Sequence, residues 1–171
     1  MAQVLMIVAI LFGVFLDQIS KYLVVIYMEL GESVDIIPGV FRFTYIRNQG
    51  SAFGMFSDSR WVFLVLSVVG IAAVIFYLVK FRPTQKLMWI PLAMIAGGGI
   101  GNMVDRLFYG ESFGNGTVVD FLDFCPFPNL WMWIFNVADS FVCVGAGILF
   151  VYLLIDIIRE YKAEKNGKSN G

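Results

Sequence analysis

The stretch VLMIVAILFGVFLDQISKYLVVIYM (Val4–Met28) decides the fold, because it is long and apolar enough to cross a lipid bilayer as one helix. The hydrocarbon core of a bilayer is about 30 Å thick, which takes about 20 mainly apolar residues of helix. Its fifteen Leu, Ile, Val or Phe residues favour insertion by about 4.5 to 9 kcal/mol, whereas Asp17 opposes it by about 2.5 to 3.5 kcal/mol. The segment lacks the basic start and small-residue cleavage site of a secretory signal, so we expect a retained span.

The rest of the chain has the same apolar character. Of its 171 residues, 59% are apolar and 15% are charged, with a mean hydropathy of +0.79, whereas a soluble domain has about 45–50% apolar and about 25% charged residues. Three further windows are long enough to span a bilayer: Trp61–Val79, Leu87–Val104 and Trp131–Ile158. The sequence therefore predicts an all-α membrane protein with four transmembrane helices in one domain, residues 1–158, followed by a polar cytoplasmic tail, residues 159–171.

Basic residues predict which ends of the spans face the cytoplasm. One cluster lies between the second and third spans and another follows the fourth span; the members are Lys80, Arg82, Lys86, Arg159, Lys162, Lys165 and Lys168. Both termini are therefore expected in the cytoplasm, and the loops at about 30–60 and 105–130 are expected outside.

The first outer loop carries a strand signal. In Val40–Arg47 (VFRFTYIR), aromatic residues alternate with Arg42 and Thr44, which is the two-residue period of a half-buried strand. Turn-forming residues flank this stretch on both sides. We therefore expect a small extracytoplasmic β-sheet, a cradle at about residues 33–56 between the first and second helices.

The composition also excludes several kinds of chemistry. The chain has no histidine, which removes Ser-His and Cys-His nucleophile pairs and histidine-based zinc sites. Its two cysteines cannot make a four-ligand metal site, and a net charge of −1 gives no reason to expect nucleic acid. We expect no cofactor, no metal and no nucleic-acid partner.

Ionisable side chains within apolar spans are costly, and they mark candidate functional sites. Here separate segments bring polar residues to one depth, near the outer ends of the spans: Asp17, Lys21, Asn102, Asp105, Arg106, Asp120, Asn136 and Asp139. Asp17 and Lys21 are four residues apart, so a self-neutralising ion pair is an alternative to a functional role. An interfacial anchor is the corresponding alternative for Asp105 and Arg106.

Asp120 and Asp139 are the best candidates for a catalytic pair. Each is flanked by apolar residues, and neither has a cation close to it in sequence. Two carboxylates that meet in an apolar site cannot both ionise, so one becomes a base and the other an acid at neutral pH. A carboxylate paired with a cation has a lowered pKa and makes a poor acid. The proton would belong to the pair rather than to either residue.

Five segments together resemble lipoprotein signal peptidase, also called signal peptidase II, a family of bacterial membrane aspartic peptidases. They are Asp17-Gln-Ile-Ser-Lys21, Asn48-Gln-Gly-Ser-Ala-Phe-Gly54, Gly101-Asn-Met-Val-Asp-Arg106, Val118-Val-Asp-Phe121 and Phe135-Asn-Val-Ala-Asp-Ser140. They occur in the family's order and cover the chain apart from its tail. One departure is the stretch at 107–117, LFYGESFGNGT, which is longer than we expect between these motifs.

The resemblance implies a substrate, a reaction and a set of site residues. The family cleaves the signal peptide from prolipoproteins, on the amino side of a cysteine that carries diacylglycerol, in the bacterial cytoplasmic membrane. It implies that Asp120 and Asp139 are catalytic. The positions matching residues that shape or support the site are Asp17, Lys21, Asn48, Asn102, Arg106, Asn136 and Ala138. The expected partners are the lipidated signal peptide and membrane lipid, with the active site near the outer face of a monomer.

Two other classes of protein also place acids in membrane spans. A proton-coupled transporter or channel would need a polar path across the bilayer, whereas the inner halves of all the predicted spans are almost wholly apolar. A non-catalytic assembly subunit would show no hydrolysis and would copurify with a partner.

Overall fold

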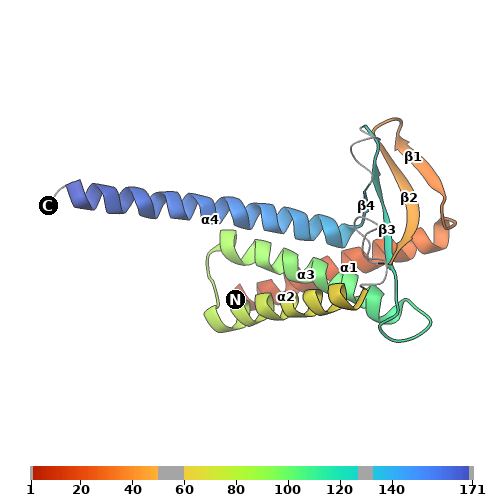
Figure 1. Cartoon of the computed structure of the whole chain (residues 1–171), viewed down its shortest axis with the longest axis horizontal. Helices are drawn as coiled ribbons and strands as arrows, with labels where there is room; N and C mark the ends of the chain where they lie inside the picture. The colour runs from red at the N-terminus through yellow and green to blue at the C-terminus, as the bar shows by residue number, and fades with distance from the viewer. Residues whose placement is uncertain (1, 50–59, 127–132, 170–171) are drawn as a thin grey trace.

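The computed structural model describes residues 2–49, 60–126 and 133–169. Within these residues the chain forms, in order, α1 (Ala2–Tyr27), β1 (Ser33–Ile37), β2 (Phe41–Asn48), α2 (Arg60–Phe81), α3 (Lys86–Phe108), β3 (Val118–Phe124), β4 (Ile134–Phe135) and α4 (Val137–Ser169) (Figure 1). All four helices are long and apolar enough to cross a membrane. This confirms the predicted fold class, a helical membrane protein with a small sheet.

The helix boundaries differ from the predicted spans mainly in α4. Its predicted start, Trp131, lies outside the described residues, and β4 occupies Ile134–Phe135, so the helix begins only at Val137. At its other end α4 continues through most of the predicted polar tail to Ser169. The first half of the tail consists mainly of Arg, Glu, Lys and Ala, and these residues favour the continuation of a helix.

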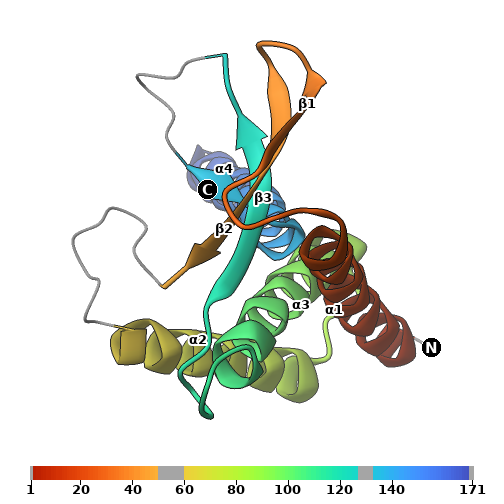
Figure 2. The same ribbon diagram turned by 90° about the vertical axis from the view of Figure 1, so that its right-hand side faces the viewer.

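Helix α3 lies at the centre of the bundle, where it packs against α1, α2 and α4 (Figure 2). Glycines allow this close approach. A Cβ on Gly98 would collide with the backbone oxygen of Ala138 in α4, and a Cβ on Gly101 would lie 2.5 Å from Asp17 Oδ2 in α1. The glycines of α3 therefore bring its backbone next to polar groups of both neighbouring helices.

Replacing Gly98 by Ala is expected to destabilise the protein by about 1–3 kcal/mol, the usual cost of overpacking. The new methyl group has no room between α3 and Ala138 of α4. Gly147→Ala in α4 is the matched control, because a Cβ there meets nothing within 4 Å. Unfolding of the detergent-solubilised variants measures the difference. Equal stability of the two variants would contradict the tight contact.

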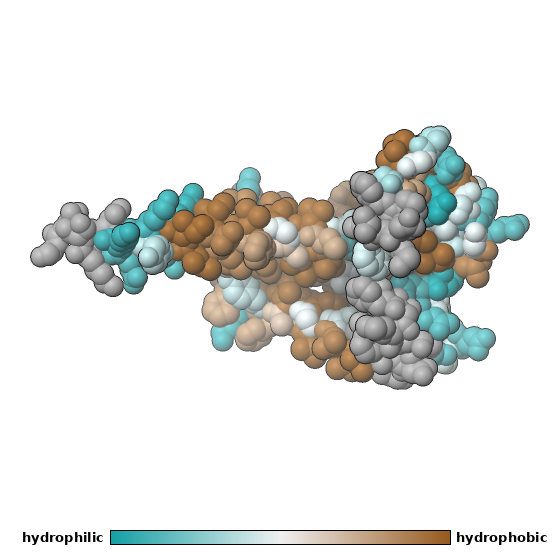
Figure 3. Space-filling model, turned by 45° about the horizontal axis from the view of Figure 1, so that its top comes forward, coloured by the Kyte–Doolittle hydropathy of each residue, from teal (hydrophilic) through white to brown (hydrophobic). Residues whose placement is uncertain are grey.

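The outward faces of the helices are apolar. Only 6% of the most apolar window of α4 is buried within the protein, and Figure 3 shows apolar side chains covering the middle of this helix. In water such a surface would be strongly unfavourable, whereas lipid chains solvate it. The chain is a multi-pass membrane protein.

The sheet is antiparallel, with the strand order β1-β2-β3-β4, and it lies at one end of the bundle, called here the sheet end (Figure 1). The prediction placed the whole sheet between the first two helices, at about 33–56. That was wrong in part, because β3 and β4 come from the connection between α3 and α4. Strand β2 needs hydrogen-bonding partners on both edges, and β3 supplies one of them. Residues 50–56 of the predicted sheet lie outside the described residues.

A hydrophobic cluster fixes the sheet on the helices. Val24 near the end of α1 is buried together with Tyr45 of β2 and Val119 and Phe121 of β3. Val137, the first residue of α4, packs against the same cluster. The contact holds β3, which contains Asp120, against the start of α4.

Candidate active site

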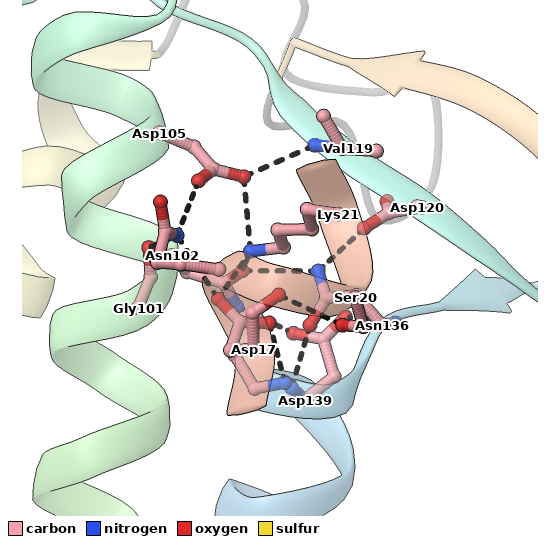
Figure 4. A network of polar contacts seen from close by, with 12 residues as sticks. Asp17, Ser20, Lys21, Gly101, Asn102, Asp105, Val119, Asp120, Asn136 and Asp139 are labelled. Atoms are coloured by element: carbon pink, nitrogen blue, oxygen red, sulfur yellow. Dashed lines mark hydrogen bonds and ion pairs between the residues drawn. The ribbon is translucent and has the colours of Figure 1, made fainter. Parts of the chain in front are cut away.

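Asp120 and Asp139 come from different elements and are joined through one asparagine. Asn136 Nδ2 donates to Asp120 Oδ1 at 2.6 Å, and the backbone N–H of Asn136 donates to Asp139 Oδ2 at 3.2 Å (Figure 4). The Asn136 side chain is fully buried. The structure therefore brings the two predicted catalytic acids to one place, linked by the residue that precedes α4.

The start of α4 explains the position of Asp139. Asn136 Oδ1 accepts from the backbone N–H of Asp139 at 2.8 Å, while Asp139 accepts from the backbone N–H of Asn136. This reciprocal arrangement is a capping box, which satisfies two N–H groups that a helix start leaves without partners. The helix macrodipole also stabilises a negative charge in the first turn. Local capping thus places a carboxylate at a fixed point beside Asp120.

Each oxygen of the two carboxylates accepts a hydrogen bond. Besides the contacts with Asn136, Asp120 Oδ2 accepts from Asn48 Nδ2 at 2.8 Å, and Asp139 Oδ1 accepts from Asn102 Nδ2 at 2.7 Å. Within the described part of the chain, neither carboxylate forms an ion pair. Neutral donors, three side-chain amides and one backbone N–H, therefore orient both acids, and in the described residues no cation is in direct contact with either carboxylate.

The environment of Asp120 favours its protonated form. Its side chain lies on β3 and is 1% exposed. Burial, and next the negative charge of Asp139, raise the pKa of Asp120 to about 7, although hydrogen bonds from Asn48 and Asn136 act in the opposite direction. Asp120 can therefore hold a proton near neutral pH and still release it.

A second cluster of charged side chains lies next to the two acids. Lys21 Nζ is 2.8 Å from Asp17 Oδ2 and 2.9 Å from Asp105 Oδ2, and it donates to Asn102 Oδ1 at 2.9 Å (Figure 4). The predicted pair of Asp17 and Lys21 therefore exists, but it is part of a network between α1 and α3. All three ionised groups are buried. Lys21 contacts three side chains there, and Asn102 connects it by hydrogen bonds to Asp139.

Asp105 is the site residue whose role was missed. Its Oδ1 accepts from Gln18 Nε2 at 2.8 Å and its Oδ2 accepts from the backbone N–H of Val119 at 3.2 Å. An interfacial anchor was one interpretation of this residue, but Asp105 is fully buried. Its position one helical turn after Asn102 was the available signal, since residues three apart share a helix face.

The remaining predicted residues lie around this network. The backbone N–H of Ala138 donates to Asp17 Oδ1 at 2.9 Å, and its side chain is fully buried. Arg106 Nη1 donates to the backbone oxygen of Asn102 at 3.4 Å. Through these two contacts and the side-chain bonds above, all nine predicted residues belong to one hydrogen-bonded network: Asp17, Lys21, Asn48, Asn102, Arg106, Asp120, Asn136, Ala138 and Asp139.

A cavity of about 470 Å³ opens beside the acids. Its polar wall includes Asn48, Asn102, Arg106 and Asp139, whereas the buried Asp120 is not among the lining residues. The apolar wall is made of side chains from three helices: Ile71 of α2, Ile95 of α3, and Val142 of α4, with others. The cavity thus leads from the polar site towards the lipid-facing helices. In the described residues, no group of three or more acids and cysteines is arranged to hold a metal ion.

Comparisons with known proteins agree with one another. A family model described as signal peptidase (SPase) II matches residues 8–155. A lipoprotein signal peptidase of Bacillus pumilus is 43% identical over 141 residues, 82% of this chain and 86% of that protein. One of Halalkalibacterium halodurans is 40% identical over 153 residues, 90% of this chain and 93% of that protein.

A solved structure adds a likeness in three dimensions. It is a bacterial membrane enzyme determined by the in meso method at 2.3 Å resolution. It superimposes on this fold with a TM-score of 0.78 at 30% identity, covering 89% of this chain and 88% of its own. A second such structure, at 1.9 Å, gives a TM-score of 0.75 at 30% identity, with 87% and 92% covered.

Proposed function

This chain belongs to the signal peptidase II family, and from that premise we propose that Asp120 and Asp139 activate a water molecule for peptide hydrolysis. The family itself gives the coarser function: the chain is a membrane peptidase that cleaves lipoprotein signal peptides. The observation that carries the finer proposal is the connection between the two acids through Asn136. Through Asn136 the two carboxylates share one site. Neutral groups donate to their oxygens, and neither carboxylate forms an ion pair in the described residues.

The proposed division of labour follows from the surroundings of each acid. Asp120 is buried behind the cavity wall and holds the proton, whereas Asp139 faces the cavity at the positive end of α4 and is the base. Asp139 takes a proton from water as the water oxygen attacks the scissile carbonyl. Asp120 supports the oxyanion and then gives its proton to the leaving nitrogen. The proton on Asp139 then passes to Asp120, which restores the starting state of the pair.

The cavity supports a lipidated substrate that arrives from within the bilayer. Its apolar wall is formed by residues of α2, α3 and α4, so acyl chains and an apolar signal helix find matching surface there. The polar wall with Asn48 and Arg106 suits an unwound peptide segment, whose free backbone groups need hydrogen-bonding partners. We infer cleavage on the amino side of the diacylglyceryl-cysteine, whose lipid stays in the membrane.

The proposed location is the bacterial cytoplasmic membrane, with the sheet end outside and both termini in the cytoplasm. The α2–α3 connection and the C-terminus lie at the end opposite the sheet (Figure 1). These are the parts of the chain with the basic clusters, including Lys80, Lys86 and Arg159. The positive-inside rule places such clusters in the cytoplasm. We expect the enzyme to act as a monomer, since one chain supplies both proposed acids and the asparagines that orient them.

The function is tested with the purified protein and a lipidated preprotein in detergent. Mass spectrometry is expected to find one cut, immediately before the lipidated cysteine. The matched control is the same preprotein without the diacylglyceryl group, for which we expect little turnover. Cleavage at another bond, or equal turnover of both substrates, would contradict the proposed specificity.

Lys21 is proposed as a positioning residue that acts through Asn102. Its Nζ donates to Asn102 Oδ1, so the amide group must turn its Nδ2 towards Asp139. Asn136 Nδ2 donates to the same oxygen at 3.0 Å. The buried cation thus selects the amide orientation that donates to the catalytic base.

A neutral version of the charge cluster separates this role from simple stabilisation. Lys21→Met alone leaves two buried acids unpaired, which typically costs about 3–5 kcal/mol. The triple variant D17N/K21M/D105N removes all three charges and is expected to fold. We expect its kcat to fall by about 10- to 100-fold, the worth of one charge-assisted hydrogen bond, with little change in KM. A wild-type kcat in the triple variant would show that Lys21 is only structural.

A further inference from the structure

The connection between α3 and β3 takes no part in the proposed chemistry, and it carries exposed aromatic side chains. Phe108 ends α3, and Phe113 lies in the loop that follows, residues 109–117. Their rings meet edge to face with centroids 5.7 Å apart. Nevertheless Phe108 is 65% exposed and Phe113 is 73% exposed. The two rings contact each other but leave most of their apolar surface uncovered by the protein.

This exposure does not result from an open or extended loop. The backbone N–H of Gly114 donates to the oxygen of Leu107 at 3.1 Å, and that of Gly116 donates to the oxygen of Arg106 at 2.9 Å. Gly114 has a φ of 77°, and a Cβ on Gly116 would collide with the oxygen of Asp105. These contacts fold the loop back onto the end of α3. The backbone therefore holds the two rings outward in a defined arrangement.

The position of the loop indicates the environment of the two rings. The predicted apolar span ends at Val104 and the helix itself ends at Phe108, so the loop begins just beyond the end of this span. Figures 1 and 2 both show the loop at the sheet end, on the side of α3 away from β1 and β2. It thus lies at the end of the helical bundle and outside the sheet.

We propose that Phe108 and Phe113 form an interfacial anchor that enters the border between lipid headgroups and acyl chains. Aromatic side chains concentrate at this depth, and exposed apolar rings gain free energy on leaving water. Residues 107–117 contain no Lys or Arg and one acid, Glu111. Attraction to anionic headgroups therefore contributes little, and the anchor depends on apolar contact.

The anchor fixes the depth of the strand that carries Asp120. The backbone N–H of Tyr109, at the start of the loop, donates to the oxygen of Asp105, and that of Gly116, near its other end, donates to the oxygen of Arg106 just before the loop runs into β3. Asp105 in turn accepts from the N–H of Val119. A loop held at the membrane surface thus holds the α3–β3 junction at one depth. This inference does not depend on the proposed catalytic mechanism.

Spin labels measure the depth directly in vesicles of phosphatidylcholine and phosphatidylglycerol. Cysteine is introduced at Phe113 or at Glu111, in a chain where Cys125 and Cys143 are replaced by Ser, and is then labelled with a nitroxide. Collision rates with oxygen, which partitions into lipid, and with a water-soluble nickel chelate are compared. We expect the ratio of oxygen to chelate collisions to be severalfold higher at Phe113→Cys than at Glu111→Cys.

A second variant tests the rings without labelling them. In F108S/F113S, a label at Ser112→Cys is expected to become severalfold more accessible to the chelate than the same label beside the native rings. Equal chelate accessibility at positions 111 and 113 would overturn the anchor. Protection of position 113 from both reagents would also overturn it, because a protein partner or a second copy would then cover the rings.

Discussion

Replacing Asp139 by Asn is expected to lower kcat by about 10³-fold or more, because a positioned general base contributes about 10²–10⁴ to the rate. Asparagine has nearly the same size as aspartate but cannot take a proton from water. Replacing Asp120 by Asn is expected to have an effect of the same order, because the oxyanion and the leaving nitrogen lose their proton donor. KM is expected to change little for Asp120→Asn, because the proposed contacts of Asp120 with the oxyanion and the leaving nitrogen form during the reaction and not in the bound substrate. Turnover of a lipidated preprotein measures both variants.

Asp123 provides a matched control on the same strand as Asp120. It is also buried, at 8% exposure, and its Oδ2 accepts from Arg42 at 2.6 Å and from Thr44 at 2.8 Å. These partners lie in the sheet, away from the acids joined by Asn136. Asp123→Asn is therefore expected to retain turnover within a few fold of the unaltered protein. Loss of activity in Asp123→Asn together with activity in Asp139→Asn would exclude the proposed pair.

Asn136 is expected to show the second largest effect, and two variants separate its two roles. Asn136→Ser keeps a side-chain oxygen that accepts from the N–H of Asp139, so the helix cap survives. It loses the Nδ2 donor to Asp120 and Asn102. We expect a loss in kcat of about 10- to 100-fold, because two buried oxygens lose a donor, at a cost of about 1–3 kcal/mol.

Asn136→Ala removes the cap as well. We expect the same loss in kcat, and in addition a loss of about 0.5–2 kcal/mol in the free energy of unfolding, the usual worth of a helix cap. Unfolding of both variants in detergent, together with their turnover, provides the test. If Asn136→Ser were as active as the unaltered protein, the connection between the acids would have no catalytic role.

The sequence was most informative where one physical requirement dominated. Spans are visible because lipid demands an unbroken apolar run, as in Val4–Met28. The two acids were proposed because buried carboxylates without a nearby cation are rare and costly. The structure does bring Asp120 and Asp139 together, from segments that the sequence alone could place only at the same depth.

Features that depend on the direction of side chains and on distant pairing were not predictable in the same way. Strand β3 has no clean alternation, because VVDFLDF is buried on both faces over much of its length, so no two-residue period marks it. The role of Asp105 depends on which way α3 faces α1, and its spacing from Asn102 does not determine that. The capping box of Asn136 and Asp139 was not predicted, and its use as a link between two acids depends on β3 being in place.

The central claim is that Asp120 shares a proton with Asp139 and carries it near neutral pH. Because burial and the charge of Asp139 raise the pKa of Asp120 to about 7, the carboxyl is protonated below that pH and ionised above it. Infrared titration of the purified protein measures this state directly. We expect a protonated-carboxyl band that disappears as the pH rises through about 7 and that Asp120→Asn lacks. A spectrum in which Asp120→Asn and the unaltered protein show the same carboxyl bands across this range would contradict the account.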